Sequence, residues 1–580
     1  MRALASTIGI VLAATAGAAP APAPVERPVL AVVGATLWDG TGAAPIPDSI
    51  VVVRGERVVA AGPRASVRVP AGAEVLDGTG RWLIPGLIDA HVHFFQSGGL
   101  YTRPDIVDFT GLVSYADEVQ TIRERLDETF RRYLASGVTA VVDAGGPLWN
   151  FDVRRQALAS ACAPRVAVAG PLISTVARPQ LALGDPPIIR AASADDARRL
   201  VRAQLPLRPD FIKVWYVPTT ERPASESLAI LEAAADEAHR AGLRLAVHAT
   251  ERESARAAVA AGADILVHSV DDAPVDDDFL RELKAHGTIY TTTLVVLEGY
   301  AGALGGGGPE LLPVERRWSD ARVLATWREF AARGNEPAAR QAMAARRERA
   351  ARAQAVMAAN LRALATAGVT IAAGTDAGNI GTPHGPALHR ELVRMAEAGL
   401  EPRTILLAAT RDAARVFARE PEIGTIAPGK LADMLLVEGD PLADIANVQR
   451  IARVVRGGSV SEPRQLVAPS AESVVQDQLE AYNARDLERF VAQYAPDAIL
   501  LRAGGDVAAA GREAIRALYR DLFRDSPALR CTVLERTVDG ALVADDELVT
   551  GLRGGPPVRA LAVYEVADGL IQRVHLFRRP

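Results

Sequence analysis

The residues best suited to chemistry in this 580-residue chain are histidines, one aspartate and one lysine in or directly after short apolar segments. They are His91, His93, Lys213, His248, His268 and Asp376. His91 and His93 alternate with Val92, and side chains two apart on a strand point to the same side, so both imidazoles can share one cation. A single histidine is as often a core residue as a ligand. The convergence of all these side chains favours a metal centre.

Lys213 stands out because it lies within the apolar segment FIKVWYV of a chain that is poor in lysine. Burial of an unpaired ammonium is costly, so it lowers the pKa and favours the neutral amine. A neutral amine can react with carbon dioxide, and the two anionic oxygens of the resulting carbamate can bridge two cations. The alternative is a lysine that is paired with a nearby carboxylate such as Asp143.

These groups together predict a hydrolytic metal centre. The positive charge of two divalent ions exceeds the combined negative charge of a carbamate, Asp376 and a bridging hydroxide by one unit. Such a centre lowers the pKa of its bound water and polarises a carbonyl group. Nitrogen and oxygen ligands without thiolate fit zinc, with manganese, cobalt or iron as alternatives. As the catalytic residue, Asp376 can take up the proton of the hydroxide and deliver it to a leaving nitrogen.

The segments that carry these residues alternate with amphipathic helices between residues 83 and 411, which predicts a closed (β/α)8 TIM barrel with its chemistry at the carboxyl ends of the strands. Short β-rich runs in residues 30–82 and 412–460 predict a composite β-sandwich that is split around the barrel. Residues 468–580 predict a separate α+β domain, with helices at 471–484 and 512–523. The eight expected strands are LIPGLIDAHVH, TAVVDAG, RVAVAGPLIS, FIKVWYV, RLAVHA, ILVHSV, IYTTTLVVL and TIAAGTDAG.

Composition and termini limit the partners and the compartment. The net charge of −5, with both signs interleaved, argues against nucleic-acid binding and leaves a small-molecule substrate. Residues 1–19 read as a signal peptide, which predicts a periplasmic or secreted protein without stable membrane insertion once the signal is removed. The alternative is an uncleaved anchor. We expect the segment LGGGGPE to form a loop over the barrel mouth, because no Gly-Lys-Ser/Thr follows it.

The motifs LIPGLIDAHVHF and AAGTDAG, the lysine-containing strand and the two single-histidine strands resemble the amidohydrolase superfamily, in its binuclear branch with a carbamylated lysine. The resemblance spans residues 30–458. It implies that His91, His93 and Asp376 hold the more buried of two divalent ions, and that carbamylated Lys213 bridges both. It further implies that His248 and His268 hold the second ion.

Within that superfamily, DFIKVW and the segment TPHGPALHRELVRMAEAGLEPRTILLAAT resemble the imidazolonepropionase-like and prolidase-like branch. This resemblance implies hydrolysis of the amide bond of a peptide-like or N-acyl amino acid substrate by a metal-bridging hydroxide, with Tyr216 and His384 as substrate contacts. The alternative roles are ordinary rim packing for Tyr216 and a helix-start position for His384. A lactone, ester or cyclic-amide hydrolase and a non-catalytic ligand-binding protein remain as alternatives.

The C-terminal segments EAYNARDLERFVAQYAPDAIL and GREAIRALYRDLF resemble the cone-shaped nuclear-transport-factor-like domains that include ketosteroid isomerases. The positions where those isomerases carry acid and base groups read Gln478, Arg502 and Val563 here, which argues against isomerase chemistry. We therefore expect either a small-ligand pocket or a dimerisation module that joins the chain into a homo-oligomer.

Overall fold

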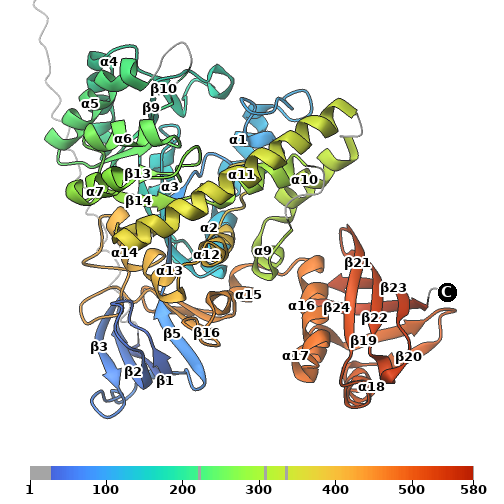
Figure 1. Cartoon of the computed structure of the whole chain (residues 1–580). Coiled ribbons are helices and arrows are strands. Elements are labelled where there is room, and N and C mark those ends of the chain that lie inside the picture. The colour runs from blue at the N-terminus through green and yellow to red at the C-terminus, as the bar shows by residue number, and fades with distance from the viewer. Residues whose placement is uncertain (1–27, 218, 220–223, 306–309, 334–336, 579–580) are drawn as a thin grey trace, which may run out of the picture.

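The computed structural model describes residues 28–217, 219, 224–305, 310–333 and 337–578 (Figure 1). The predicted signal peptide and most of the glycine run at 305–308 lie outside these residues. Four sheets and the helices around them make up the described chain. No described helix combines the length and apolar character needed to cross a membrane.

Residues 30–461 form one unit, and both of its ends contribute to one mixed sheet, in the order β18-β17-β16-β5-β1-β2-β3, with β4 paired to β1. β16 pairs antiparallel with β5, which joins the C-terminal part of this unit to the N-terminal part. The segments predicted as a split β-sandwich therefore meet in a single hydrogen-bonded sheet. Its strands are β1 (Leu30–Leu37), β2 (Ile46–Arg54), β3 (Arg57–Pro63), β4 (Glu74–Asp77), β5 (Arg81–Pro85), β16 (Met434–Glu438), β17 (Ile451–Arg456) and β18 (Ser459–Ser461).

All eight segments predicted as parallel strands are found in two parallel sheets, β6-β7-β8 and β10-β9-β11-β12-β13-β14-β15. An isolated parallel bridge between Val92 and Ala377 links the end of β6 to the segment after β15. The strands are β6 (Leu87–Val92), β7 (Val138–Asp143), β8 (Arg165–Val168), β9 (Leu172–Ser174), β10 (Ile188–Arg190), β11 (Ile212–Trp215), β12 (Leu245–His248), β13 (Ile265–Val267), β14 (Ile289–Thr292) and β15 (Ile371–Ala373).

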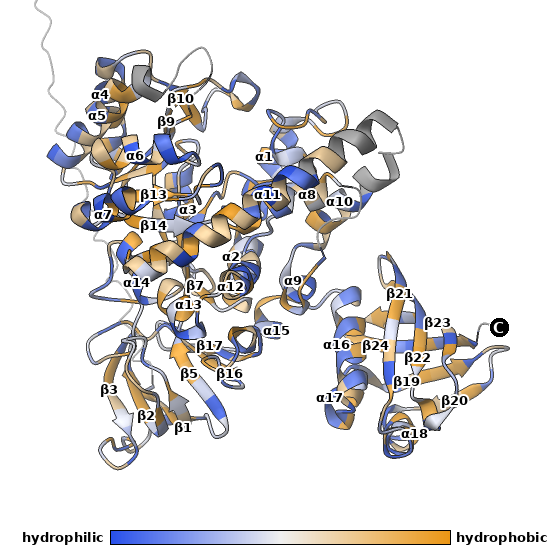
Figure 2. Cartoon of the chain, in the orientation of Figure 1, coloured by the Kyte–Doolittle hydropathy of each residue, from blue (hydrophilic) through white to orange (hydrophobic). Residues whose placement is uncertain are grey.

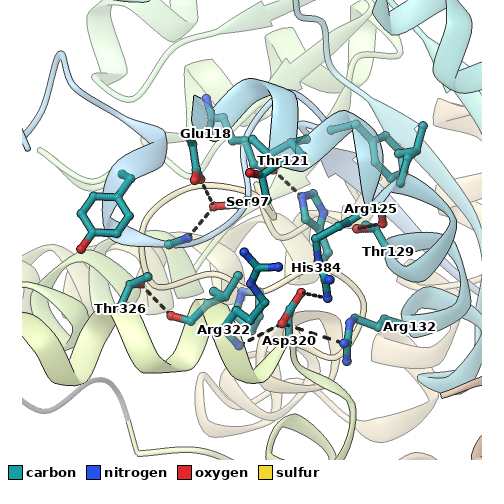
Figure 3. A pocket seen from close by; sticks show the side chains of 18 of the residues that line it. Ser97, Glu118, Thr121, Arg125, Thr129, Arg132, Asp320, Arg322, Thr326 and His384 are labelled. Carbon is teal, nitrogen blue, oxygen red and sulfur yellow. Dashed lines mark hydrogen bonds and ion pairs between the residues drawn. The ribbon is translucent and has the colours of Figure 1, made fainter. Parts of the chain in front are cut away.

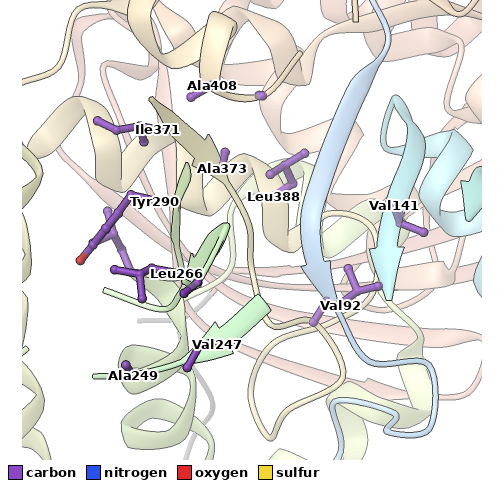
Figure 4. Packing of buried hydrophobic residues seen from close by; sticks show 14 of the residues in the cluster. Val92, Val141, Val247, Ala249, Leu266, Tyr290, Ile371, Ala373, Leu388 and Ala408 are labelled. Atoms are coloured by element: carbon purple, nitrogen blue, oxygen red, sulfur yellow. The ribbon is translucent and has the colours of Figure 1, made fainter. Parts of the chain in front are cut away.

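The two parallel sheets share one hydrophobic core. Figure 4 shows Val92 and Val141 on one side of this core and Val247, Leu266 and Ile371 on the other. Each of these side chains is at least nine-tenths buried. Figure 2 shows that apolar residues are concentrated in the strands. Removal of this apolar surface from water is the main force that holds both sheets together.

Helices with one buried face connect these strands. In α4 the side chain of Ser193 caps the first turn, and Ala197, Val201 and Gln204 share the buried face at helical spacing. α7 ends at Gly287, whose φ of 67° suits glycine. The helices are α1 (Tyr115–Glu124), α2 (Leu126–Ala135), α3 (Asn150–Ala159), α4 (Ala194–Gln204), α5 (Ala224–Arg240), α6 (Arg252–Ala260), α7 (Asp277–His286), α8 (Val295–Ala303), α9 (Pro313–Trp318), α10 (Ala321–Arg333), α11 (Pro337–Ala367), α12 (Ala387–Glu397), α13 (Pro402–Ala408), α14 (Arg411–Val416) and α15 (Pro463–Leu466).

The C-terminal domain has its own core and a six-stranded mixed sheet in the order β20-β19-β24-β23-β22-β21. Its first helix has the predicted bounds, and its third helix ends one residue later than predicted. The elements are α16 (Ala471–Ala484), α17 (Leu487–Val491), β19 (Tyr494–Arg502), β20 (Val507–Ala510), α18 (Arg512–Arg524), β21 (Arg530–Asp539), β22 (Leu542–Thr550), β23 (Val558–Ala567) and β24 (Leu570–Arg578).

Ion pairs join this domain to the preceding part of the chain through α16, which lies next to α9 (Figure 1). Arg317 of α9 contacts Asp477 and, at 2.6 Å, Glu480. Arg328 of α10 lies 2.8 Å from Glu472. The side chains of Arg317 and Asp477 are mostly buried, so water and salt weaken this contact less than an exposed ion pair.

Candidate metal centre

The end of β6 and the turn after β15 bring two histidines and an aspartate together. His91 Nε2 lies 3.2 Å from His93 Nε2, and Asp376 Oδ1 lies 3.4 Å and 3.3 Å from these two nitrogens. The ligand atoms all lie within 4.8 Å of one another, so this buried group could hold a metal ion. Asp376 Oδ1 has no hydrogen-bond partner, which leaves a buried carboxylate oxygen available to a cation.

Backbone geometry at this site depends on small and strained residues. A Cβ atom at Gly374 would lie 2.9 Å from the Cβ of His91, so only glycine lets β15 approach β6 this closely. Asp376 and His268 have φ values of 57° and 79°. These values lie in the left-handed region, which residues other than glycine seldom adopt. Strain of this kind is retained where a side chain must point in a specified direction.

His248 and His268 form the adjacent part of the site. Their ring centres lie 4.3 Å apart, and the ring of His268 lies 4.7 Å from that of His91. His268 Nδ1 contacts Thr293 Oγ1 at 2.9 Å and lies 4.0 Å from Asp376 Oδ2. The four histidines predicted as ligands are therefore neighbours.

Lys213 is fully buried on β11, and its Nζ has no hydrogen-bond partner. The alternative ion pair with Asp143 is not seen. The carboxylate of Asp143 instead accepts hydrogen bonds from Asn150 Nδ2 at 2.8 Å and from the backbone N–H of Gly145. Burial lowers the pKa of Lys213 to about 7, and the charge of Asp376 opposes this shift. The neutral amine that carbamate formation needs is therefore accessible near neutral pH.

The protonation of the other groups suits cation binding. Burial, with Lys213 as a further cause, lowers the pKa of His93 to about 3, and burial likewise holds the pKa values of His91, His248 and His268 far below their usual value. His93 Nδ1 lies 2.7 Å from the Gly145 carbonyl oxygen and donates to it, which leaves the Nε2 lone pair free. Burial raises the pKa of Asp376 to about 7. Neutral imidazoles are the form that binds metals.

A cavity of about 300 Å³ opens beside this cluster. Besides His93, Lys213, His248, His268 and Asp376, its lining includes Trp215, Asp271, Tyr300, Arg349 and Asn379. His91 lies behind this surface and is fully buried. The arrangement is that of a partly open small-molecule site in which polar and charged side chains outnumber apolar ones.

Arg103 is a further residue of this cavity, and sequence reasoning missed it. Its guanidinium pairs with both carboxylate oxygens of Asp105 at 2.8 Å and donates to Asn379 Oδ1 at 2.7 Å. Tyr300 donates to the same amide oxygen at 2.6 Å. The only signal in the sequence was one arginine in the loop after the first histidine strand, among many arginines in this chain.

The two predicted substrate contacts lie elsewhere. Tyr216 is 1% exposed and packs in the main core. Because β-strand side chains alternate, its neighbour Trp215 shares the cavity side with Lys213. His384 lies against a second cavity, where its ring nitrogens contact the Tyr133 hydroxyl and the Gln96 carbonyl, each at 2.7 Å.

The C-terminal domain encloses a separate cavity of about 630 Å³ that includes Gln478 and Arg502 in its lining. Glu547 is a buried carboxyl in this cavity and accepts a hydrogen bond from Tyr564 at 3.1 Å. Burial raises the pKa of Glu547 to about 7. The expected small-ligand pocket therefore has a physical counterpart.

Comparison with protein families identifies the class of protein. Residues 82–460 match the model of the amidohydrolase family, and residues 475–574 match that of the SnoaL-like domain. The chain therefore belongs to the amidohydrolase family, a family of hydrolases, and carries a C-terminal SnoaL-like domain. Both predicted resemblances are confirmed.

Individual relatives are more distant. The chain is 44% identical over 55 residues to the imidazolonepropionase of Rhizobium meliloti (strain 1021), a match that covers 9% of this chain and 13% of that protein. The chain is 42% identical over 65 residues to the imidazolonepropionase of Caulobacter vibrioides (strain NA1000 / CB15N), a match that covers 11% of this chain and 16% of that protein. The matches thus span less than a fifth of these relatives.

Solved structures share the fold of about three quarters of this chain. A Xaa-Pro dipeptidase crystallised with methionine in its active site is similar at a TM-score of 0.56 and 22% identity, over 75% of this chain and 100% of that one. A molinate hydrolase is similar at a TM-score of 0.56 and 22% identity, over 76% of this chain and 96% of that one. A prolidase complexed with N-methylphosphonate-L-proline is similar at 0.55 and 22%, over 75% and 99%.

Proposed function

We propose that this protein hydrolyses the amide bond of a peptide-like or N-acyl amino acid substrate with the help of two divalent metal ions, most suitably zinc. His91, His93 and Asp376 would hold the first ion, and His248 and His268 the second. A carbamate on Lys213 would link both. The convergence of these side chains on one 300 Å³ cavity is the observation that carries the proposal.

The donor set fits such ions. Four imidazoles, one carboxylate and one unpartnered lysine lie together, all of them buried except the partly exposed His248, and none of the donors is a thiolate. This combination of nitrogen and oxygen ligands is typical of zinc. When bound, the ions would supply an acidified water and polarise the substrate carbonyl. We also propose that the two parallel sheets, linked by the Val92–Ala377 bridge, form one closed barrel.

The chain's own residues would guide proton transfer. Asp376 has a raised pKa and a carboxylate oxygen without a hydrogen-bond partner. It is therefore suited to accept a proton from the attacking water and to donate it to the leaving nitrogen. Asp105, Tyr300 and Asn379 hold the guanidinium of Arg103 at the cavity wall. A remaining N–H of this guanidinium would donate a hydrogen bond to the free carboxylate of the substrate.

Metal analysis combined with a substrate screen tests this function. Purified protein should contain divalent metal and should hydrolyse dipeptides or N-acyl amino acids. Asp376→Asn protein that is shown to contain metal should have lost turnover by a factor of at least about 100. Asp271→Asn is the matched control, since this carboxyl lines the same cavity outside the histidine cluster. Turnover of lactones alone would overturn the amide assignment.

A further inference from the structure

A second, partly open cavity lies next to the metal cavity, between α1, α2 and α10 (Figure 3). Its volume of about 400 Å³ is within the usual range for small-molecule sites. The loop after β6 separates it from the metal cavity, and the side chain of Gln96 borders both. None of the proposed metal ligands lines it.

We propose that this cavity binds a small organic carboxylate with an apolar body, as a second ligand site beside the metal centre. The site is additional to the proposed hydrolytic function. Its ligand class follows from two features of the lining, which are an apolar surface and an excess of guanidinium groups.

Apolar side chains provide room for the body of the ligand. They come from the loop after β6, from α1 and α2, and from α10, and they include Phe94, Ile122, Leu126 and Val323. Phe94 and Leu126 are buried, whereas Ile122 and Val323 are partly exposed. A ligand that covered this surface would gain roughly 25 cal/mol for each Å² of apolar area removed from water.

The charged side chains are divided between two sides of the cavity. Figure 3 shows Glu118 and Ser97 at one side, and Asp320 with Arg125, Arg132 and Arg322 at the other. Three arginines thus line the cavity near Asp320, and the arrangement would suit the carboxylate of a ligand.

The three arginines differ in how far carboxylates compensate them. Arg125 pairs with Glu128 of α2, and its Nη2 also lies 3.2 Å from Asp320 Oδ2. Arg132 Nη2 lies 4.0 Å from Asp320 Oδ1, which is beyond hydrogen-bond distance. Arg322 donates to Asp320 through its backbone N–H, so this contact does not use its guanidinium.

On the opposite side, Ser97 donates to Glu118 Oε1 at 2.6 Å. Burial raises the pKa of Glu118, whereas Ser97 and the charge of Arg322 lower it. Among the described residues, the guanidinium of Arg132 has no carboxylate within hydrogen-bond distance, and its Nε is buried without a hydrogen-bond partner. A neutral ligand of the same shape would leave Arg132 without such a carboxylate.

The position of the cavity connects it to catalysis. His384 lines the cavity and contacts the Gln96 carbonyl oxygen at 2.7 Å, while the Gln96 side chain also borders the metal cavity. A bound carboxylate would therefore press on a wall that both cavities share. An amino acid derivative with a free carboxylate, or another organic acid, would fit the proposed ligand class.

Isothermal titration of the metal-loaded protein tests the site with 4-phenylbutyrate and with 4-phenyl-1-butanol, which has the same body without the charge. The carboxylate should bind at least about tenfold more tightly than the alcohol. Arg322→Gln should weaken carboxylate binding by about tenfold. Ile122→Trp, which would fill the cavity, should abolish it.

The matched control separates the two cavities. Arg322 and Arg349 are both exposed arginines, but Arg322 lines the second cavity and Arg349 lines the metal cavity. Arg349→Gln should leave binding unchanged within about twofold. Equal binding of acid and alcohol, or a loss in Arg349→Gln without one in Arg322→Gln, would overturn the proposal. Because the readout is binding and not turnover, it stands apart from the test of the hydrolytic function.

Discussion

Asp376 Oδ1 lies 3.3 Å from His93 Nε2, although the two residues are far apart in the sequence and follow different strands. The neighbouring parallel strands end at the same edge, so residues after β6 and β15 meet there. Together with His91, this pair forms the buried group that could hold a metal ion.

Replacement of Lys213 by Ala should lower both the metal content and the rate of hydrolysis, because the bridging carbamate would be lost. Short carboxylic acids should restore part of the activity by occupying the vacated space. Elemental analysis and rate measurements with added formate or acetate check this. Lys284→Ala, at an exposed lysine of α7, is the control and should behave as wild type. Unchanged metal content in Lys213→Ala would exclude the bridging role.

Arg103→Gln should lower kcat/KM for N-acyl amino acids by about 10- to 100-fold, the range expected for loss of a charge-assisted contact to a carboxylate. The effect should be much smaller on the matching amides, which lack that charge. The ratio of the two kcat/KM values is therefore the informative quantity. Arg322→Gln, outside the metal cavity, should leave the ratio unchanged. A similar loss for both substrates would instead indicate a structural role.

Acid should destabilise the protein partly through His389, which is buried and lies 2.8 Å from the Ser136 carbonyl oxygen. Burial lowers its pKa to about 4, below the usual value of 6.5. The unfolded chain therefore binds more protons between these values, and stability falls as the pH is lowered from 6.5 towards 4. The contribution is about 1.4 kcal/mol per pH unit.

Denaturation midpoints between pH 7 and pH 5 test this contribution. His389→Gln should show a shallower loss of stability with falling pH than wild type. His286→Gln removes an exposed histidine and should not change the slope. Parallel curves for wild type and His389→Gln would show that His389 is not a source of the acid sensitivity.

Leu231→Ala on α5 should destabilise the unit of residues 30–461 by about 2–5 kcal/mol, because Leu231 is fully buried in the main core and the change leaves a cavity. Leu158→Ala is a matched leucine on α3 that is 76% exposed, and it should change stability by less than about 0.5 kcal/mol. Urea denaturation followed by circular dichroism measures both. Equal midpoints would contradict the assigned packing of α5.

The strands and the ligand cluster could be predicted because they depend on local pattern. Apolar runs ended by histidine or aspartate indicated strand ends, and helix α16 had recognisable limits, with Ser470 as its cap. The sequence pattern also indicated Lys213 correctly as a buried lysine without a hydrogen-bond partner.

The rest depends on tertiary contacts. The strands expected to form a sandwich join one mixed sheet, because the pairing of β5 with β16 is set by packing between distant segments. Strand periodicity would have favoured Trp215 over Tyr216 as a cavity residue. Arg103 could not be singled out, since its partner Asn379 is distant in sequence and its type is common in this chain.

A crystal structure of the zinc-loaded protein, with anomalous data collected at the zinc edge, shows whether two ions bind among these side chains. We expect one anomalous peak among His91, His93 and Asp376 and a second beside His248 and His268, with a carbamate on Lys213 between them. A map without peaks among these side chains, obtained from protein saturated with zinc, would contradict this expectation.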